Sequence, residues 1–299
     1  MIRQDIIELF RVPPGKKIRL RDYNPGWAQT KEMKELGKDD IKERARIILE
    51  KNLGDLAEAQ ERLWADDRYA VLVVLQALDA AGKDGTIKHV MSGVNPQGCQ
   101  VFSFKKPTAE ELDHNFLWRY MRCLPERGRI GIFNRSYYED VLVVKVHPEL
   151  LTVQKLPPAK RDKAFWQARY EDINAFERHL VRNGTIILKF FLNVSKKEQK
   201  RRFLERLENP EKHWKFSASD LAERGFWEQY TTAYEDAFRA TSTEWAPWYI
   251  VPADHKWATR AIVADILTSA MLGLDLRYPE VTEEQQQALE QARQQLEHE

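Results

Sequence analysis

Five short apolar runs along the chain predict buried β-strands. The run from Tyr69 to Gln76 is continuous and rich in valine, which is typical of a strand covered on both faces in a parallel sheet. Further runs occupy residues 99–104, 129–133, 185–192 and 248–251. Helical segments lie between the runs, so the alternation predicts an α/β fold with a parallel sheet and right-handed crossovers.

Helical spacing of apolar residues predicts the connecting helices. The segment from Lys38 to Asp67 has this spacing, and Gly54 is expected to interrupt it. Residues 1–30 are expected to be irregular, because Pro and Gly punctuate them. The other predicted helices occupy residues 108–123, 161–182, 196–208, 217–240 and 256–273.

The final segment, residues 282–299, is almost wholly polar. Its apolar residues form only a thin stripe at helical spacing. A frayed terminal helix is the main interpretation, and a contact between subunits is the alternative. The stripe consists of Ala288, Leu289, Ala292 and Leu296.

Composition and charge narrow the class of protein. The 299 residues suffice for one large α/β domain or two small ones. A formal net charge of +1 argues against a globally basic nucleic-acid-binding protein. No apolar run approaches the roughly 20 residues of a membrane span, and the N-terminus lacks a secretory pattern. The two cysteines have no metal-ligand spacing. We therefore expect a cytoplasmic protein with no nucleic-acid or membrane partner.

A candidate phosphate-binding loop follows the first predicted strand. Residues 77–86 read Ala-Leu-Asp-Ala-Ala-Gly-Lys-Asp-Gly-Thr, and a helix is expected to begin there. Free backbone N–H groups and the positive end of a helix dipole converge at such a turn. A glycine allows close approach of the backbone, and a lysine reaches terminal phosphoryl oxygens. The expected phosphate-binding residues are Ala80, Ala81, Gly82, Lys83, Asp84, Gly85 and Thr86.

This loop departs from the usual pattern G-x-x-x-x-G-K-[ST] at two positions. Ala77 replaces the first glycine, and Asp84 replaces the hydroxyl residue that normally holds Mg²⁺. Thr86 restores a hydroxyl two places further on. The carboxylate of Asp79 supplies the oxygen ligands that Mg²⁺ prefers beside phosphates. An ordinary strand-to-helix turn without a ligand is the alternative interpretation.

Three motifs in this order resemble the signatures of the polyphosphate kinase 2 family. The first is residues 79–86, and the second is Gly-Arg-Ile-Gly-Ile-Phe-Asn-Arg-Ser-Tyr-Tyr-Glu-Asp-Val over residues 128–141. The third is Asn-Pro-Glu-Lys-His-Trp-Lys-Phe over residues 209–216. The similarity runs from about residue 15 to residue 275, which is nearly the whole chain.

The resemblance implies a three-layer αβα P-loop kinase-like fold, related to thymidylate kinases. Its central parallel sheet is expected to have five strands, with a helical lid over the active site. The chain is expected to form a single domain over residues 1–299. Its expected parts are an N-terminal extension and helix (1–66), the kinase core (67–275) with a lid at about 196–225, and a polar tail (276–299).

The strand at residues 129–133 ends in polar side chains. Ligands bind at the carboxyl ends of strands in open α/β sheets, so these side chains are expected to face a substrate. Most members of the family have Asp where this chain has Asn134. The pair of Asn134 and Glu139 resembles the class III branch, which accepts both nucleoside mono- and diphosphates. For Arg135, a surface ion pair with Glu139 or Asp140 is the alternative to a role at the phosphoryl group. The expected catalytic residues are Asp79, Lys83, Arg135 and Glu139.

A basic segment follows the fourth predicted strand. Residues 196–215 hold eight Lys or Arg against four Glu. Arginine forks match phosphate geometry, and lysine supplies a mobile point charge. A solvated charged face is the alternative interpretation of this segment. The expected polyphosphate-binding residues are Arg201, Arg202, Arg206, Lys212 and Lys215.

The resemblance implies that these features carry out direct in-line phosphoryl transfer between inorganic polyphosphate and AMP or ADP. The expected cofactor is Mg²⁺, with Mn²⁺ as a substitute, held by Asp79 and Asp140. The expected nucleotide contacts are Asn95, Asn134, Lys105 and Lys106. Asn95 is included because it resembles a position that the family uses at its active site, and an ordinary turn is the alternative. Lys105 and Lys106 are included for their charge.

The identity of the partners follows from the resemblance. Adenine nucleotides are expected, with guanine nucleotides as an open alternative, and the family implies a homo-oligomer, either a dimer or a tetramer. Two other functions stay open. One is an ATP-dependent nucleoside or nucleotide kinase, and the other is a nucleotide-binding protein without catalysis.

Overall fold

A computed structural model describes residues 1–215 and 217–299, without the side chains of Lys215 and Ala218. The last residue of the third motif, Phe216, and the expected polyphosphate contact of Lys215 therefore lie outside the described residues. The α-helices are α1 (Gln4–Glu8), α2 (Lys31–Leu36), α3 (Lys38–Asp66), α4 (Lys83–Val90), α5 (Ala109–Leu112), α6 (Trp118–Met121), α7 (Val143–Val146), α8 (Lys163–Arg182), α9 (Lys196–Glu208), α10 (Ala218–Glu223), α11 (Trp227–Thr241), α12 (Lys256–Leu272) and α13 (Glu283–Glu297).

Short 3₁₀ helices connect several of these elements. They occupy Leu20–Asp22, Pro96–Gly98, Tyr137–Asp140, Pro148–Gln154, Pro210–Lys215 and Arg224–Phe226. The strands are β1 (Ala70–Gln76), β2 (Cys99–Ser103), β3 (Ile130–Asn134), β4 (Thr185–Asn193) and β5 (Trp248–Pro252).

The five strands form one parallel sheet in the order β2-β3-β1-β4-β5. Strand β1 lies in the middle, between β3 and β4, and all seven of its residues are buried. This position explains its unbroken apolar sequence, because a central strand of a parallel sheet meets helices on both faces. The predicted α/β class and five-stranded parallel sheet are confirmed.

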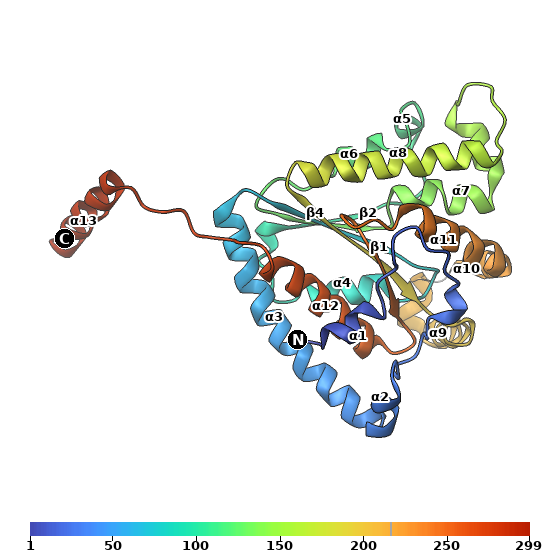
Figure 1. Ribbon diagram of the computed structural model, residues 1–299, viewed down its shortest axis with the longest axis horizontal. Coiled ribbons are helices and arrows are strands. Elements are labelled where there is room, and N and C mark those ends of the chain that lie inside the picture. Colours follow the sequence, from blue (N-terminus) through green and yellow to red (C-terminus); the bar gives the residue numbers. More distant parts are fainter. Residues whose placement is uncertain (216) are drawn as a thin grey trace.

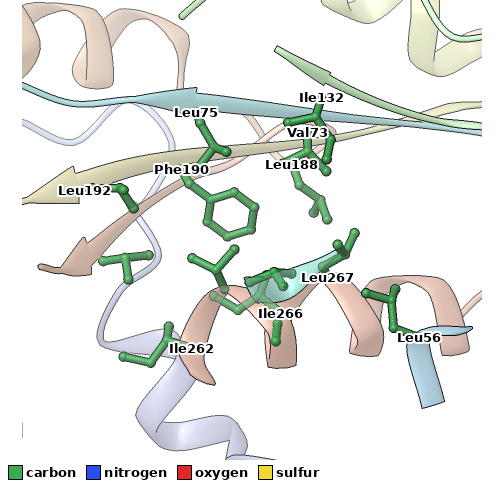
Figure 2. Packing of buried hydrophobic residues seen from close by; sticks show 14 of the residues in the cluster. Leu56, Val73, Leu75, Ile132, Leu188, Phe190, Leu192, Ile262, Ile266 and Leu267 are labelled. Atoms are coloured by element: carbon green, nitrogen blue, oxygen red, sulfur yellow. The ribbon is translucent and has the colours of Figure 1, made fainter. Parts of the chain in front are cut away.

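Helices cover the sheet on both faces (Figure 1). Helices α3, α4 and α12 lie against one face, and α7, α8 and α11 lie against the other. On the first face, Leu75 and Phe190 from the strands point toward Ile262 and Ile266 of α12 (Figure 2). The core therefore has two apolar layers, and the loops at the strand ends are free to form a site.

The N-terminal segment closes one edge of the sheet. The main-chain N–H of Val12 donates to the carbonyl of Trp248 at 2.8 Å, and the N–H of Ile250 donates to the carbonyl of Phe10 at 2.7 Å. An edge strand leaves such groups unpaired, so the segment satisfies the outer side of β5. The expectation that residues 1–30 are irregular is therefore wrong for α1 (Gln4–Glu8) and for the bridge between Arg11 and Tyr249 of β5.

Three helix predictions differ from the structure. Helix α3 continues through Gly54, because burial of Leu56 and Leu63 beside α12 outweighs the roughly 1 kcal/mol cost of a helical glycine. The predicted helix 108–123 is two short helices, α5 and α6. The predicted helix 217–240 is split into α10 and α11 by a 3₁₀ turn that contains Gly225.

The predicted C-terminal helix is present as α13. It projects away from the rest of the chain (Figure 1), and Leu289 and Leu296 on it are 61% and 69% exposed. A subunit contact through this helix stays a prediction. Within residues 1–215 and 217–299, no helix is both long enough and apolar enough to cross a membrane.

We expect Phe190→Ala to lower the free energy of unfolding by about 3–5 kcal/mol, because it leaves a cavity between the sheet and α12. Phe190 is fully buried in the layer shown in Figure 2. Denaturant unfolding followed by circular dichroism measures this change. Leu289→Ala on the exposed face of α13 is the control, and its stability should match that of the parent. An equal loss in both variants would contradict the assigned core.

Candidate functional site

A cavity of about 790 Å³ opens where the carboxyl ends of β1, β2 and β3 meet. The candidate phosphate-binding loop of residues 77–86, called the phosphate loop below, forms its floor, and residues from β3, α9 and α12 complete its walls. Segments far apart in the sequence therefore converge on one space. The lining residues are Asp79, Ala80, Ala81, Gly82, Lys83, Asp84, Gly85, Thr86, Ser103, Phe104, Lys105, Asn134, Arg135, Arg202, Glu205, Arg206, Lys212, Trp214, Asp220, Lys256, Thr259 and Arg260.

The phosphate loop has the tight backbone that its sequence predicts. Gly82 has φ 108° and Ala80 has φ 59°, so the loop makes two left-handed steps before α4 begins. Glycine takes such a step without strain, whereas alanine does so at a cost. No side chain caps the start of α4. Its first backbone N–H groups are consequently available to an anion in the cavity.

Side chains of α9 hold this loop from behind. Arg202 donates to the carbonyls of Ala80 at 3.0 Å and Ala81 at 2.6 Å. The amide of Gln199 donates to the carbonyl of Asp79 at 3.0 Å. With three successive carbonyls engaged, the strained turn is kept in place by the helix beside it.

Lys83 lies in the first turn of α4 and faces the cavity. Its ammonium donates to the carbonyl of Ala77 at 3.1 Å. Burial, and after it the neighbouring charge of Arg135, lowers the pKa of Lys83 to about 8, although the carboxylate of Asp79 acts in the opposite direction. The nearby carboxylates therefore do not fully offset the cost of burying the positive charge of Lys83. An anionic ligand in the cavity would stabilise that charge.

Arg135 links the ends of two strands. It follows β3 in a left-handed conformation, with φ 67°. Its guanidinium donates to Asp79 Oδ1 at 2.8 Å and to Glu139 Oε2 at 3.1 Å. Glu139, and after it Asp79, raises the pKa of Arg135, so its positive charge is fixed. The structure therefore joins three of the expected catalytic residues directly, and Lys83 lies within their field.

Asn134 contacts the phosphate loop from the neighbouring strand. Its amide nitrogen donates to Asp84 Oδ1 at 2.8 Å and to Ser103 Oγ at 3.4 Å. An amide does not take up a proton at neutral pH, so Asn134 fixes Asp84 rather than acting as a base. Asp84, which departs from the usual loop pattern, is thus bonded to Asn134, which stands where most members of the family have Asp.

A buried polar network supports the turn after Arg135. The hydroxyls of Tyr137 and Tyr138 both donate to Glu177 Oε1 at 2.8 Å. Lys189 donates to Glu177 Oε2 at 2.6 Å, and both side chains are fully buried. The sequence analysis did not predict this network. Lys189, the one charged residue in the apolar strand 185–192, could have indicated it, because a buried lysine needs a charged partner.

Some expected site residues lie away from the cavity lining. Asp140 accepts from Gln154 at 2.8 Å and lies beside Arg169, and burial raises its pKa to about 6. Asn95 is exposed and caps its own turn by accepting from the N–H of Gln97. Of the two expected lysines, Lys105 lines the cavity, and Lys106 is absent from its lining.

Arg201, Arg206 and Lys212 of the expected lid are paired with carboxylates. Arg201 is 60% exposed, contacts Glu198 at 2.6 Å and does not line the cavity. Arg206 and Lys212 do line it, and Lys212 donates to Glu205 at 2.7 Å. Their role in binding polyphosphate stays a prediction.

Sequence reasoning also missed one wall of the cavity. Lys256 and Arg260 project from the first two turns of α12, and Asp220 lies on α10. The sequence could have indicated this wall, because Lys256 and Arg260, two basic residues four positions apart, lie at the start of the helix after the last strand. Residues at this spacing share one face of a helix.

The carboxylates at the cavity are suited to a divalent cation that is shared with a substrate. In the part of the chain that the structure describes, no three His, Cys, Asp or Glu side chains cluster as a metal site. Asp79 and Asp84 nevertheless flank Lys83 at the cavity. Mg²⁺ is usually bound through one or two carboxylates together with substrate phosphates, and this arrangement fits that mode.

Comparisons with known proteins agree on one family. The family model described as polyphosphate kinase 2 matches residues 38–277. An ADP-polyphosphate phosphotransferase of Rhodopseudomonas palustris is 53% identical over 258 residues, which cover 86% of this chain and 89% of that protein. An AMP/ADP-polyphosphate phosphotransferase of Meiothermus ruber is 46% identical over 271 residues, with 91% and 95% covered. A crystal structure of polyphosphate kinase 2 from Arthrobacter aurescens TC1 superposes with a TM-score of 0.83 at 40% identity, over 95% of each chain.

We expect the ammonium of Lys83 to titrate near pH 8, so that it is charged below this pH and neutral above it. NMR of the protein with ¹³C-methylated lysines measures the titration, and the signal lost in Lys83→Arg assigns it. Added pyrophosphate should raise this pKa, because an anion stabilises the charged form. A value near 10.5 without ligand would contradict the described burial.

Proposed function

This chain belongs to the polyphosphate kinase 2 family, and we propose that it transfers the terminal phosphoryl group of inorganic polyphosphate to AMP or ADP, and in the reverse direction. The single observation that carries this proposal is the junction of Lys83 in the phosphate loop with the bridge from Asp79 through Arg135 to Glu139. Cations and hydrogen-bond donors there face a cavity in which an anionic donor and an anionic acceptor can meet.

The reaction requires positioning and charge neutralisation more than covalent help. An oxygen of the acceptor's terminal phosphate forms a bond to the terminal phosphorus of polyphosphate. The P–O bond to the rest of the donor breaks, and the shortened polyphosphate leaves with the bridging oxygen. The acceptor phosphate is already an anion, so no base is needed, which agrees with an amide at Asn134.

Each charged side chain has a distinct part in this scheme. Lys83 neutralises oxygens of the transferred group as a point charge, and the fork of Arg135 contacts the same group from the end of β3. Asp79 and Glu139 hold the fork in its orientation through the contacts at 2.8 and 3.1 Å. Arg202 lines the cavity but supports the loop rather than the substrate, since its Nη atoms donate to the carbonyls of Ala80, Ala81 and Ala253.

We assign the metal to the cavity carboxylates. Asp79, with Asp84 beside it, would hold Mg²⁺ or Mn²⁺, and the ion would supply charge neutralisation between donor and acceptor phosphates when bound. Asp140 is the weaker ligand, because its carboxylate is buried against Gln154 outside the cavity lining.

Acceptance of both AMP and ADP is supported by the class III-like pair of Asn134 and Glu139. The Meiothermus ruber relative is named for both acceptors, and the Rhodopseudomonas palustris relative is named for ADP. Of the expected nucleotide contacts, Asn134 and Lys105 line the cavity and are the ones that we retain. An ATP-dependent nucleoside kinase is not favoured by these relatives.

The proposal also includes a cytoplasmic location. Cys99 and Cys123 are free thiols, which suits the reducing cytoplasm where nucleotides are abundant. A homo-oligomer stays an expectation from the family.

One assay separates the candidate functions. The purified protein is incubated with Mg²⁺, ADP and polyphosphate, and ATP is followed over time. Formation of ATP supports the proposal. Transfer from ATP to a nucleoside without any use of polyphosphate would support a nucleoside kinase, and nucleotide binding alone would support a non-catalytic protein.

We expect Lys83→Ala to lower the turnover of ADP by about 10²-fold or more, because one charged donor to the transition state is lost. Initial rates of ATP formation measure the effect. Lys88→Ala, an exposed lysine of the same helix, is the matched control and should keep the parent rate. Near-normal activity of Lys83→Ala would show that the phosphate loop is assigned wrongly.

The two acidic positions should differ in their dependence on metal. We expect Asp79→Asn to raise the Mg²⁺ concentration needed for half-maximal rate, because a ligand at the cavity is lost. Asp140→Asn should leave that concentration unchanged, since its carboxylate does not line the cavity. Rates over a Mg²⁺ series measure both. If Asp140→Asn instead raised the required Mg²⁺ concentration and Asp79→Asn did not, the metal would be assigned to Asp140.

A further inference from the structure

The α12 wall of the cavity, which we define as Lys256 and Arg260, carries two cations without partners. Among residues 1–215 and 217–299, neither side chain makes a hydrogen bond or an ion pair. The two are four residues apart, so they lie on one face of the helix, about 6 Å apart along its axis. Both charges are thus available to a ligand in the cavity.

These cations are only partly compensated by the protein itself. Burial lowers the pKa of Lys256, and the charge of Arg202 lowers it further. Burial also lowers the pKa of Arg260. A charge that is partly removed from water and has no partner costs free energy, so an anion against this wall would be stabilised.

The cations of the expected lid that line the cavity, unlike those of the α12 wall, already form ion pairs with carboxylates. Lys212 lies 2.7 Å from Glu205, and Arg206 lies 3.6 Å from Asp220. A phosphate that binds these side chains has to compete with carboxylates. The α12 wall presents no such competition, so it is the better binding surface for a polyanion.

The α12 wall is also continuous with the phosphate loop. A side chain at Gly85 would begin 3.7 Å from Nη2 of Arg260, so this guanidinium lies next to the first turn of α4. Lys256 lies farther toward the lid, within the fields of Glu205 and Lys212. The order Lys83, Arg260, Lys256 therefore leads from the loop along α12.

We propose that Lys256 and Arg260 bind the phosphate units of the polyphosphate donor behind its reacting end, so that the donor chain leaves the phosphate loop along α12. This inference rests on the proposed function and adds the path and the binding residues of the donor. The spacing of the two cations is on the scale of a pair of linked phosphate groups. The acceptor AMP or ADP carries only one or two phosphate groups, whereas polyphosphate continues past its reacting end, so a row of cations that leads away from the loop suits the donor.

The test compares Lys256→Ala, Arg260→Ala and the double variant with the parent protein. Each single change should raise the KM for long-chain polyphosphate about tenfold, as expected for one lost charge-assisted contact. The kcat and the KM for ADP should stay within about twofold, because neither side chain faces the acceptor in this scheme. With tripolyphosphate as donor, which is too short to occupy the whole wall, the effect should shrink.

Controls separate binding from folding. Lys88→Ala should leave the KM for polyphosphate unchanged, and Lys256→Arg should restore it. Thermal unfolding of each variant should match that of the parent. An unchanged KM for long polyphosphate in the double variant, or a rise in the KM for ADP instead, would overturn the inference.

Failure of the proposed function is distinguishable from failure of this inference. If the parent and Lys88→Ala both form no ATP from ADP and polyphosphate, the proposed function fails. Binding of fluorescently labelled polyphosphate, followed by anisotropy, then decides the inference alone. Weaker binding by the double variant than by Lys88→Ala supports the α12 wall, and equal binding rejects it.

Discussion

The guanidinium of Arg202 connects the three segments on which the site depends. It donates to the carbonyls of Ala80 and Ala81 in the phosphate loop and to the carbonyl of Ala253 before α12, at 3.0, 2.6 and 2.6 Å. Its Nε donates to Glu198 of its own helix at 2.8 Å. Arginine suits this position because its planar fork directs several donors at once. Loop, α9 and the start of α12 are thereby held at fixed positions around one cavity.

This anchoring explains how a strained loop persists. Ala80 adopts a left-handed conformation that disfavours a residue with a side chain, and Gly82 follows it in another left-handed step. Strain of this kind persists only where surrounding contacts enforce it. The carbonyls bonded by Gln199 and Arg202 supply those contacts, and the uncapped start of α4 is left facing the cavity.

The charges at the cavity divide into two groups. Arg135 forms ion pairs with both Asp79 and Glu139, and Lys212 is paired with Glu205. Lys83, Lys256 and Arg260 are instead left with lowered pKa values and incomplete compensation. The first group gives orientation and the second gives attraction for anions. A phosphotransferase that brings two polyanions together needs both properties.

The sequence by itself determined those elements that depend only on residues close to one another along the chain. The valine-rich run became β1, the alternation of runs predicted the parallel sheet, and Gly82 with Lys83 marked the loop that lines the cavity. Tertiary structure alone decided which distant residues meet. It placed Asp140 in a buried contact with Gln154 outside the cavity, bonded Arg202 to the carbonyls of the loop, and brought the α12 wall to the same cavity as Lys212. The physical reason is that periodicity and turn chemistry depend on near neighbours, whereas burial and charge pairing depend on how the helices pack across the sheet.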